Sequence, residues 1–322
     1  MTRNKGGTGA AKATSGDSRE CREPNEAANR SKPEAVELPL AGDLPPPGLH
    51  IVATPIGNLG DISERALMAL RGADRILCED TRVTSKLLAR YAIKRPLEPY
   101  HDHNAEKMRP AILAALRQGQ RLALVSDAGT PLVSDPGYKL VRAAIAENLP
   151  VTAEPGPSAA LTALILSGLP PDCFLFAGFL PRRTAARRQV LAGWASLDAT
   201  LIFYEAAPRL AAALADMAEI LGPRPAAVAR ELTKLHEEVR RGKIADLGDY
   251  YRREGPPRGE IVVVVGPPEP AAPLAEDELD RRLRAAMADF GVRDAAAKLA
   301  AETGLSRQHL YRRALAIRGG ST

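Results

Sequence analysis

The 322-residue chain has few cysteines and few aromatic residues, and it contains no long apolar run. Its cysteines, at positions 21, 78 and 173, are too few for a disulfide framework and too far apart for a C-x-x-C metal clamp. The densest apolar run, 261–265, is much shorter than the roughly 20 residues that cross a bilayer. Because residues 1–12 also lack the pattern of an export signal, we expect a cytoplasmic protein without a membrane partner.

The overall composition is that of a globular protein, with 45% apolar and 26% charged residues. The length leaves room for two domains of about 150 residues each. Residues 1–48 differ from the rest, because they are rich in polar residues, glycine and proline and have no apolar period. Such a segment buries too little apolar surface to offset its ordering entropy, so we predict a disordered tail over 1–48.

The net charge of +5 is concentrated at one end of the chain. Residues 279–322 contain nine basic and four acidic residues, which leaves the rest of the chain close to neutral. A basic end on a neutral body favours contact between that end and a polyanion. From the charge alone, however, a solvated helical face is the more common explanation.

Short apolar runs alternate with amphipathic stretches from residue 49 onward. The expected strands are 49–54, 75–79, 121–126, 150–153, 174–179, 199–204, 225–231 and 260–265. The expected helices are 62–71, 84–91, 104–118, 137–147, 158–168, 184–196, 208–221 and 243–253. This alternation predicts an α/β fold with two mostly parallel sheets covered by helices.

Proline-rich joints divide the chain. The joint at 168–171 separates an α/β subdomain over 49–169 from a second one over 170–268, and the linker 266–273 precedes a helical end over 274–322. Helices are expected there near 276–289, 293–302 and 306–317. A helix, a glycine-bearing turn and a serine-capped basic helix in this order are typical of a helix-turn-helix.

Four loops follow strands, which is where open parallel sheets place their ligands. The loop 126–137 is longer than the 2–6 residues that a connection needs, and its two prolines and two glycines favour a functional role. In the loop 154–159, Ser158 is placed to cap a helix whose free amides suit a carboxylate. The loop 54–61 has no dinucleotide fingerprint, and the mixed charges of 229–238 fit either a polar substrate or a solvated turn.

Two polar clusters, 79–82 and 101–104, also follow strands of the first half. His101 and His103 have the spacing of two metal ligands, but no third ligand stands at a diagnostic distance, so we expect no metal. Hydrogen bonding or substrate contact is the favoured role for both clusters. The carboxylates expected to face one cleft are Asp61, Glu79, Asp80 and Asp102.

Seven motifs in order carry a family resemblance: TPIGNLGD, CEDTR, SDAGTPLVSDPG, EPGPSA, FYEA-x-x-R, ARELTKLHEE and GEIVVVV. Together they resemble the ribosomal RNA small-subunit methyltransferase I group of the tetrapyrrole-methylase superfamily. The resemblance covers about residues 49–269, and the basic helical end is similar to the usual C-terminal extension of that group. One departure is FYEAAPR at 203–209, where the family pattern reads FYEAPHR.

The resemblance implies two α/β domains that hold S-adenosylmethionine in the cleft between them. It also implies 2′-O-methylation of a cytidine ribose in the decoding region of 16S ribosomal RNA, by a homodimer that acts on the RNA or the 30S subunit. Carried over by position, the implied cofactor contacts are Pro55, Ile56, Thr130, Val133, Ser158 and Ala159, followed by Ala206 and Ala229.

Methyl transfer from a sulfonium is an in-line displacement, so the protein must chiefly align the sulfur, the methyl group and the oxygen. A nearby base that removes the hydroxyl proton should add roughly 10²–10⁴-fold. The catalytic candidates are Asp80, Glu231 and Lys234, with Asp102 as a further possible base. The candidates for contact with RNA are Arg82, His101, Asn104, Arg307, Arg312 and Arg313.

Two other functions fit parts of the sequence. A methylase acting on a small tetrapyrrole would share the fold, but such enzymes usually carry a G-x-G-x-G-D first turn in place of TPIGNLGD. A DNA-binding regulator would use the helix-turn-helix for binding and the α/β body to sense S-adenosylmethionine without consuming it.

Overall fold

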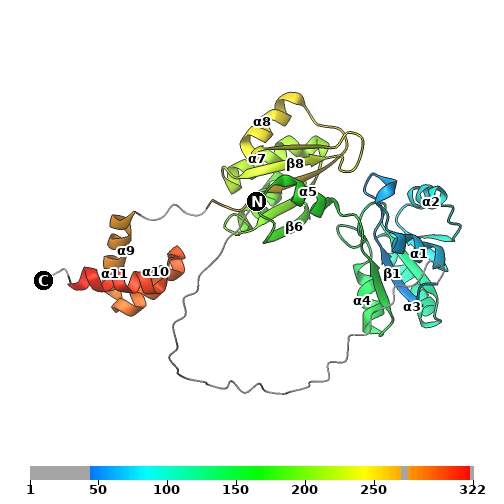
Figure 1. Cartoon of the computed structure of the whole chain (residues 1–322), viewed down its shortest axis with the longest axis horizontal. Helices are drawn as coiled ribbons and strands as arrows, with labels where there is room; N and C mark the ends of the chain where they lie inside the picture. The colour runs from blue at the N-terminus through cyan, green and yellow to red at the C-terminus, as the bar shows by residue number, and fades with distance from the viewer. Residues whose placement is uncertain (1–43, 270–274, 320–322) are drawn as a thin grey trace, which may run out of the picture. The chain divides into compact units, whose positions relative to one another are not determined.

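The computed structural model describes residues 44–269 and 275–319 (Figure 1). Residues 1–43, which make up most of the predicted tail, lie outside the described residues, as do 270–274 and 320–322. Within the described ranges, no helix is long and apolar enough to span a bilayer.

The first half forms an all-parallel sheet of five strands in the order β3-β2-β4-β1-β5. The strands are β1 (Gly48–Val52), β2 (Arg75–Cys78), β3 (Leu97–Pro99), β4 (Arg121–Val125) and β5 (Val151–Glu154). The helices are α1 (Glu64–Gly72), α2 (Thr81–Arg90), α3 (Ala105–Arg117) and α4 (Tyr138–Ala146). Leu49 and Ile51 pack toward α3 and α4, whereas Val52 packs toward α1 and α2, so both faces of the sheet are covered.

The connections that leave two neighbouring strands, β1 and β4, lead toward opposite edges of this sheet. The chain leaving β1 leads to α1 on one face, and the chain leaving β4 leads to α4 on the other. The two loops are joined by a pair of backbone hydrogen bonds between Thr54 and Gly129, at 2.8 and 3.0 Å. Such a switch point, at the carboxyl ends of parallel strands, is where open α/β sheets bind ligands.

The second sheet has the order β6-β7-β10-β8-β9, and it corrects the expectation of a second mostly parallel sheet. Its strands are β6 (Phe174–Phe179), β7 (Thr200–Ala206), β8 (Pro225–Arg230), β9 (Glu238–Lys243) and β10 (Glu260–Val265). Only β6 and β7 pair in parallel, whereas β10 runs antiparallel to both of its neighbours and β8 and β9 form a hairpin. Alternation of strands and helices predicts which surfaces are covered, but not the direction in which each strand enters the sheet.

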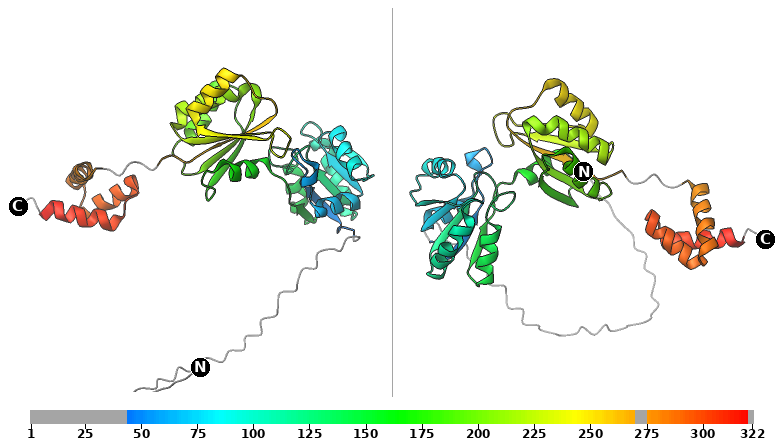
Figure 2. Two further views of the ribbon diagram at one scale, coloured as in Figure 1. Left: turned by 45° about the horizontal axis from the view of Figure 1, so that its top comes forward. Right: turned by 180° about the vertical axis from the view of Figure 1, so that it is seen from behind.

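Helices cover both faces of this second sheet (Figure 2). On one face lie α6 (Thr184–Gly193), α7 (Leu210–Leu221) and α8 (Ile244–Glu254), and on the other lies α5 (Ala159–Ser167). Successive valines of β10 alternate between these layers, with Val263 facing the first and Val264 facing α5. The predicted domain boundaries stay a prediction. Helix α5 precedes the boundary at 169 and nevertheless packs on the second sheet.

Two strands escaped the sequence analysis for different reasons. β3 has only three residues and ends at a proline, which weakens any strand signal. β9 has the sequence EVRRGK, whose charges suit an edge strand but not a buried one. Residues 44–48, which we placed in the disordered tail, belong to the described structure. The carbonyls of Pro45 and Pro46 accept hydrogen bonds from Arg121 and His50.

The helical end contains α9 (Glu276–Asp289), α10 (Val292–Thr303) and α11 (Arg307–Gly319), close to the predicted ranges. It has its own apolar core, which includes Leu283, Leu299 and Leu310. Gly304 ends α10 in the left-handed conformation, with a φ of 70°, as a C-terminal cap. This end therefore folds around contacts of its own.

Candidate functional site

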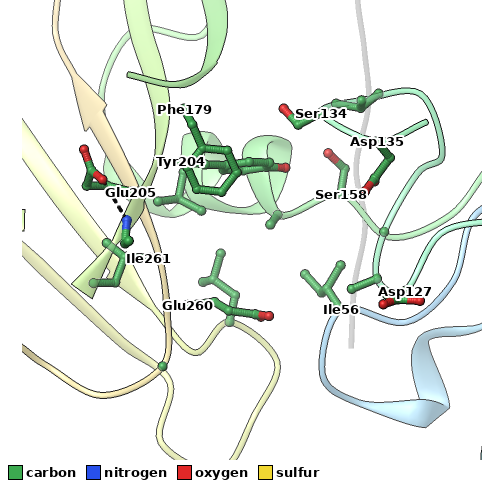
Figure 3. Close-up of a pocket in the computed structure, with 18 of the residues that line it drawn as sticks. Ile56, Asp127, Ser134, Asp135, Ser158, Phe179, Tyr204, Glu205, Glu260 and Ile261 are labelled. Carbon is green, nitrogen blue, oxygen red and sulfur yellow. Dashed lines mark hydrogen bonds between the residues drawn. The ribbon is translucent and has the colours of Figure 1, made fainter. Parts of the chain in front are cut away.

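A cavity of about 540 Å³ opens at the switch point of the first sheet (Figure 3). Figure 3 shows side chains from the loops after β1, β4 and β5 on one side and side chains of the second sheet on the other. The first group includes Ile56 and Ser158, and the second includes Tyr204 and Val262. This volume is within the range of small-molecule and cofactor sites.

The loop after β4 is held in an unusual backbone conformation. Gly129 has a φ of 81°, and the non-glycine residues Leu132 and Ser134 have φ values of 72° and 67°. The Thr130 hydroxyl donates to the Pro157 carbonyl at 3.2 Å, which joins this loop to the one after β5. Left-handed non-glycine residues are costly and concentrate at ligand sites, so the geometry supports the functional role predicted for 126–137.

Ser158 caps α5, as predicted, by accepting a hydrogen bond from the Leu161 amide at 3.5 Å. Because Ser158 and Ala159 line the cavity, the N-terminus of α5 lies at its wall. The partial positive charge and free amides of a helix N-terminus suit a carboxylate at this point.

The cavity is acidic. Four of its lining residues carry carboxyl groups, and among the described residues that line it there is no lysine, arginine or histidine. The four are Asp127, Asp135, Glu205 and Glu260. The lining therefore complements a small cationic ligand better than an anionic one.

Asp135 is the carboxyl group in the cavity whose ionisation is most strongly altered. Burial and the neighbouring carboxylates of Glu79 and Asp127 raise its pKa to about 6, against an opposing hydrogen bond from Ser126. Both effects disfavour the charged form. A carboxyl group with this pKa is largely ionised at neutral pH and is still basic enough to take a proton.

Glu205 is buried, and burial raises its pKa while the Ala206 amide and Arg209 oppose that effect. Its carboxylate accepts from the Ala206 amide at 2.8 Å and lies 3.1 Å from Arg209 Nε. The same guanidinium donates to the Leu180 carbonyl at 2.7 Å. Arg209 therefore joins β7 to the chain after β6, which gives it a positioning role despite the departure from the family pattern.

Asp80 does not line the cavity. Its carboxylate caps α2 by accepting from the Arg82 amide at 2.8 Å and pairs with the Arg82 guanidinium. These hydrogen bonds lower the pKa of Asp80 to about 2, which leaves it a weak base.

Glu231 and Lys234 lie at the rim. Lys234 Nζ donates to Glu231 at 2.8 Å and to the cavity residue Glu260 at 3.0 Å. Hydrogen bonds from Lys234 and the Glu260 backbone lower the pKa of Glu231. The loops 54–61 and 229–238 are in close contact. A Cβ added to Gly57 would stand 2.3 Å from Lys234 Cγ, so the contact leaves no room for a side chain at position 57.

The cavity gathers most of the residues to which the resemblance assigned cofactor contacts. Those that line it are Ile56, Thr130, Val133, Ser158, Ala159 and Ala206. Pro55 and Ala229 do not line it: Pro55 is buried, and Ala229 packs in the core between α5 and the second sheet.

The first-half candidates for RNA contact lie away from the cavity lining. The Asn104 side chain accepts from the His101 amide and donates to the Pro99 carbonyl, both at 2.9 Å, so it holds its own loop. The His101 ring packs edge-on against His103. Arg82 is exposed, although its guanidinium is paired with Asp80. No group of three or more histidine, cysteine or acidic residues in the described ranges is arranged to hold a metal ion.

In the helical end, Arg307 and Arg312 are exposed on α11. Arg313 differs, because its guanidinium pairs with Asp280 and contacts Glu276 of α9. Arg313 is therefore engaged in joining two helices.

Several cavity residues were not singled out from the sequence. Asp135 stands in the loop 126–137, which was predicted to be functional from its length. The sequence does not show that the carboxyl group of Asp135 is partly buried in the folded chain. Phe179 ends β6 and Tyr204 lies within β7, and an apolar period predicts core positions for both. Glu260 begins a strand of valines, and only the pairing of β10 between β7 and β8 places it at the cavity.

A family model for tetrapyrrole (corrin/porphyrin) methylases matches residues 48–248, and a model for the RsmI C-terminal HTH domain matches 273–318. A protein of Mesorhizobium japonicum named ribosomal RNA small subunit methyltransferase I is 51% identical over 85% of this chain and 94% of its own length. A protein of the same name from Erythrobacter litoralis is 54% identical over 84% of this chain and 96% of its own. The chain belongs to the ribosomal RNA small subunit methyltransferase I family of tetrapyrrole methylases. The resemblance drawn from the seven motifs is confirmed.

Two solved structures share the fold. The methyltransferase CobJ has a TM-score of 0.53 at 20% identity, covering 69% of this chain and 94% of its own. Diphthine synthase has a TM-score of 0.53 at 17% identity, covering 68% and 89%. These likenesses confirm the predicted two-part α/β fold.

Proposed function

We propose that the chain is an S-adenosylmethionine-dependent methyltransferase that acts in the cytoplasm on the 2′-hydroxyl of a cytidine in small-subunit ribosomal RNA. The names of its relatives and the family supply the reaction class. The observation that carries the proposal is the acidic cavity at the switch point, because it gathers six residues of the implied cofactor site. Neither rival function has a comparable observation in its favour.

The lining suits the methyl donor. S-adenosylmethionine supplies, when bound, a methyl group on a positively charged sulfur. Asp127 and Asp135 complement positive charge, and the α5 N-terminus at Ser158 complements a carboxylate. Ile56 and Val262 offer apolar walls for an aromatic ring. The residues present therefore fit the donor.

Asp135 is the base that we assign to the reaction, in preference to Asp80, Glu231 or Asp102. It lines the cavity, whereas Asp80 is paired with Arg82 and Glu231 with Lys234. Its carboxylate would take the proton of the ribose hydroxyl as the oxygen attacks the methyl carbon, while the methyl–sulfur bond of the donor breaks and the sulfur leaves as a neutral thioether. Lys234 is then a positioning residue, because it holds Glu260 at the rim.

The helical end is assigned to RNA capture, through Arg307 and Arg312 on α11. Exposed guanidinium groups bind phosphates without sequence preference and lose affinity as salt rises. Arg313 is not needed for this role, because it joins α9 to α11.

The chain is also proposed to act as a homodimer. The exposed side of α5 is apolar, with Leu161 50% and Ile165 74% exposed, although a helix that is apolar all round is normally buried. A second copy of the chain is the partner that we assign to this surface.

Calorimetry with S-adenosylmethionine, followed by mass mapping of ribose methylation in small-subunit RNA and in the assembled subunit, tests the function. Thr130→Trp should abolish binding of the donor because the bulky ring fills the cavity. Binding of the donor without methyl transfer to any RNA would favour the regulator, and transfer to a tetrapyrrole would favour the other enzyme. Unchanged affinity in Thr130→Trp would refute the cavity as the donor site.

A further inference from the structure

A second recess, of about 730 Å³, adjoins the acidic cavity and shares Phe179, Ala206 and Pro208 with it. Its other lining residues are Leu180, Pro181, Arg182 and Arg209. We propose that this recess binds an unpaired nucleotide of the RNA substrate, with its base stacked on Phe179 and its phosphate near Arg182 and Arg183. The inference rests on the proposed function, since it takes the acceptor to be RNA.

The backbone of β6 positions Phe179 for this role. The pairing of β6 with β7 shifts register between Phe176 and Gly178, which is a β-bulge. Gly178 has a φ of 61°, and a Cβ added there would stand 2.9 Å from Ser134 Oγ, so glycine lets the loop after β4 approach. Bulges beside functional sites redirect the side chains that follow them. Phe179 is therefore aimed at the boundary between the two cavities.

Phe179 has the exposure and the support of a stacking platform. It is 59% exposed, which is unusual for a phenylalanine that lines a cavity. The Tyr204 ring packs edge-on against it (Figure 3), with 5.6 Å between ring centroids. Phe176 in turn packs edge-on against Tyr204 at 4.9 Å. One face of a supported ring thus remains for a base, and unpaired RNA bases are commonly held by aromatic stacking.

The charges beside the recess suit a phosphate. Arg187 and Arg188, on the following helix α6, are paired with Asp216. Arg182 and Arg183 are exposed, and among the described residues neither has an ion-pair partner. The acidic lining of the first cavity would repel a phosphate. The first cavity therefore suits a positively charged ligand group, and the neighbouring recess suits a negatively charged one.

The test measures the affinity of the full chain for a fluorescent small-subunit RNA fragment that the wild-type chain methylates, with donor affinity measured in parallel by calorimetry. Phe179→Ala should weaken RNA binding about ten- to a hundredfold, and Phe179→Trp should restore it, because stacking needs an aromatic face. Since Phe179 also lines the donor cavity, the loss of RNA affinity in Phe179→Ala should exceed the loss of donor affinity. Phe174→Ala is the matched control, since Phe174 is an exposed phenylalanine of the same strand that lines neither cavity.

Arg182→Ala and Arg183→Ala should each lower the slope of log RNA affinity against log salt concentration by about one, because each removes one phosphate contact. The proposal is overturned if Phe179→Leu binds RNA as well as the wild-type chain, because apolar packing would then suffice. It is also overturned if Phe179→Ala loses the donor but keeps RNA affinity, which would place Phe179 in the donor site alone. A wild-type chain that methylates no RNA would instead refute the proposed function.

Discussion

At the scale of single residues, two aspartates in the loops that follow β2 and β4 have pKa values shifted in opposite directions. Asp80 accepts hydrogen bonds from Arg82, which hold its pKa at about 2. Asp135 is partly buried beside other carboxylates, which raise its pKa to about 6. The residue type is the same, and the difference comes from what surrounds each carboxyl group.

This contrast predicts how methyl transfer depends on pH. A base must be ionised to take a proton, so kcat/KM should rise about tenfold per pH unit below 6 and level off above it. Asp135→Asn should lower the single-turnover rate about 10²–10⁴-fold and remove this rise. Asp80→Asn is the control, and a comparable loss of rate in that variant would identify Asp80 as the base instead.

At the scale of elements, α5 has three different surroundings: the second sheet, the cavity and the solvent. Its buried side, which includes Ala163 and Leu164, packs against the second sheet. Its N-terminus lies at the cavity, and its opposite side exposes leucine and isoleucine side chains. A single short helix therefore links the sheet, the ligand site and the surface proposed for the second copy.

The exposed side of α5 gives a test of oligomeric state. Ile165→Asp should shift the chain from dimer to monomer in sedimentation velocity, because a buried unpaired carboxylate is costly at an interface. Ile145→Asp is the control, since Ile145 is 60% exposed on a different helix, α4. Dimers that persist in Ile165→Asp would contradict the assignment of this surface.

Neighbouring arginines of α11 should behave differently when they are replaced. Arg312→Ala should weaken RNA binding and lower its salt slope by about one, since the side chain is exposed. Arg313→Ala should instead lower the melting temperature of the helical end, since it removes the contact with Asp280. Binding isotherms at several salt concentrations and circular dichroism separate the two effects. The same phenotype in both variants would argue against this division.

At the scale of the whole molecule, positive charge and the donor cavity are in different parts of the chain. The excess of basic residues lies in 279–322, whereas the cavity in the α/β body is acidic. The cores of the two α/β sheets contain no residue of the helical end, which has a core of its own.

A chain that stops after Pro268 should therefore keep its affinity for S-adenosylmethionine. Its affinity for RNA should fall, and the dependence of that affinity on salt should flatten, because fewer phosphate contacts are made. Calorimetry and filter binding measure the two affinities. Loss of donor binding in the shortened chain would show that the helical end braces the α/β body.

Much of the fold was predictable because it depends on local patterns. The apolar period located most of the strands and helices, and Ser158 was recognised as a helix cap from its position alone. β9 was missed because an edge strand can carry many charged residues, as EVRRGK does. The antiparallel entry of β10 was missed because strand direction depends on contacts between segments far apart in the sequence.

Local periodicity in the sequence was enough to give the class of the fold, and the ordered motifs were enough to give the family. The family resemblance in turn implied six residues that line the cavity. The tertiary structure was needed to see which carboxyl group is partly buried in the cavity and which arginines are paired with carboxylates. Burial and pairing are properties of neighbours brought together by folding, so Asp80 and Asp135, or Arg312 and Arg313, cannot be told apart until those neighbours are in place.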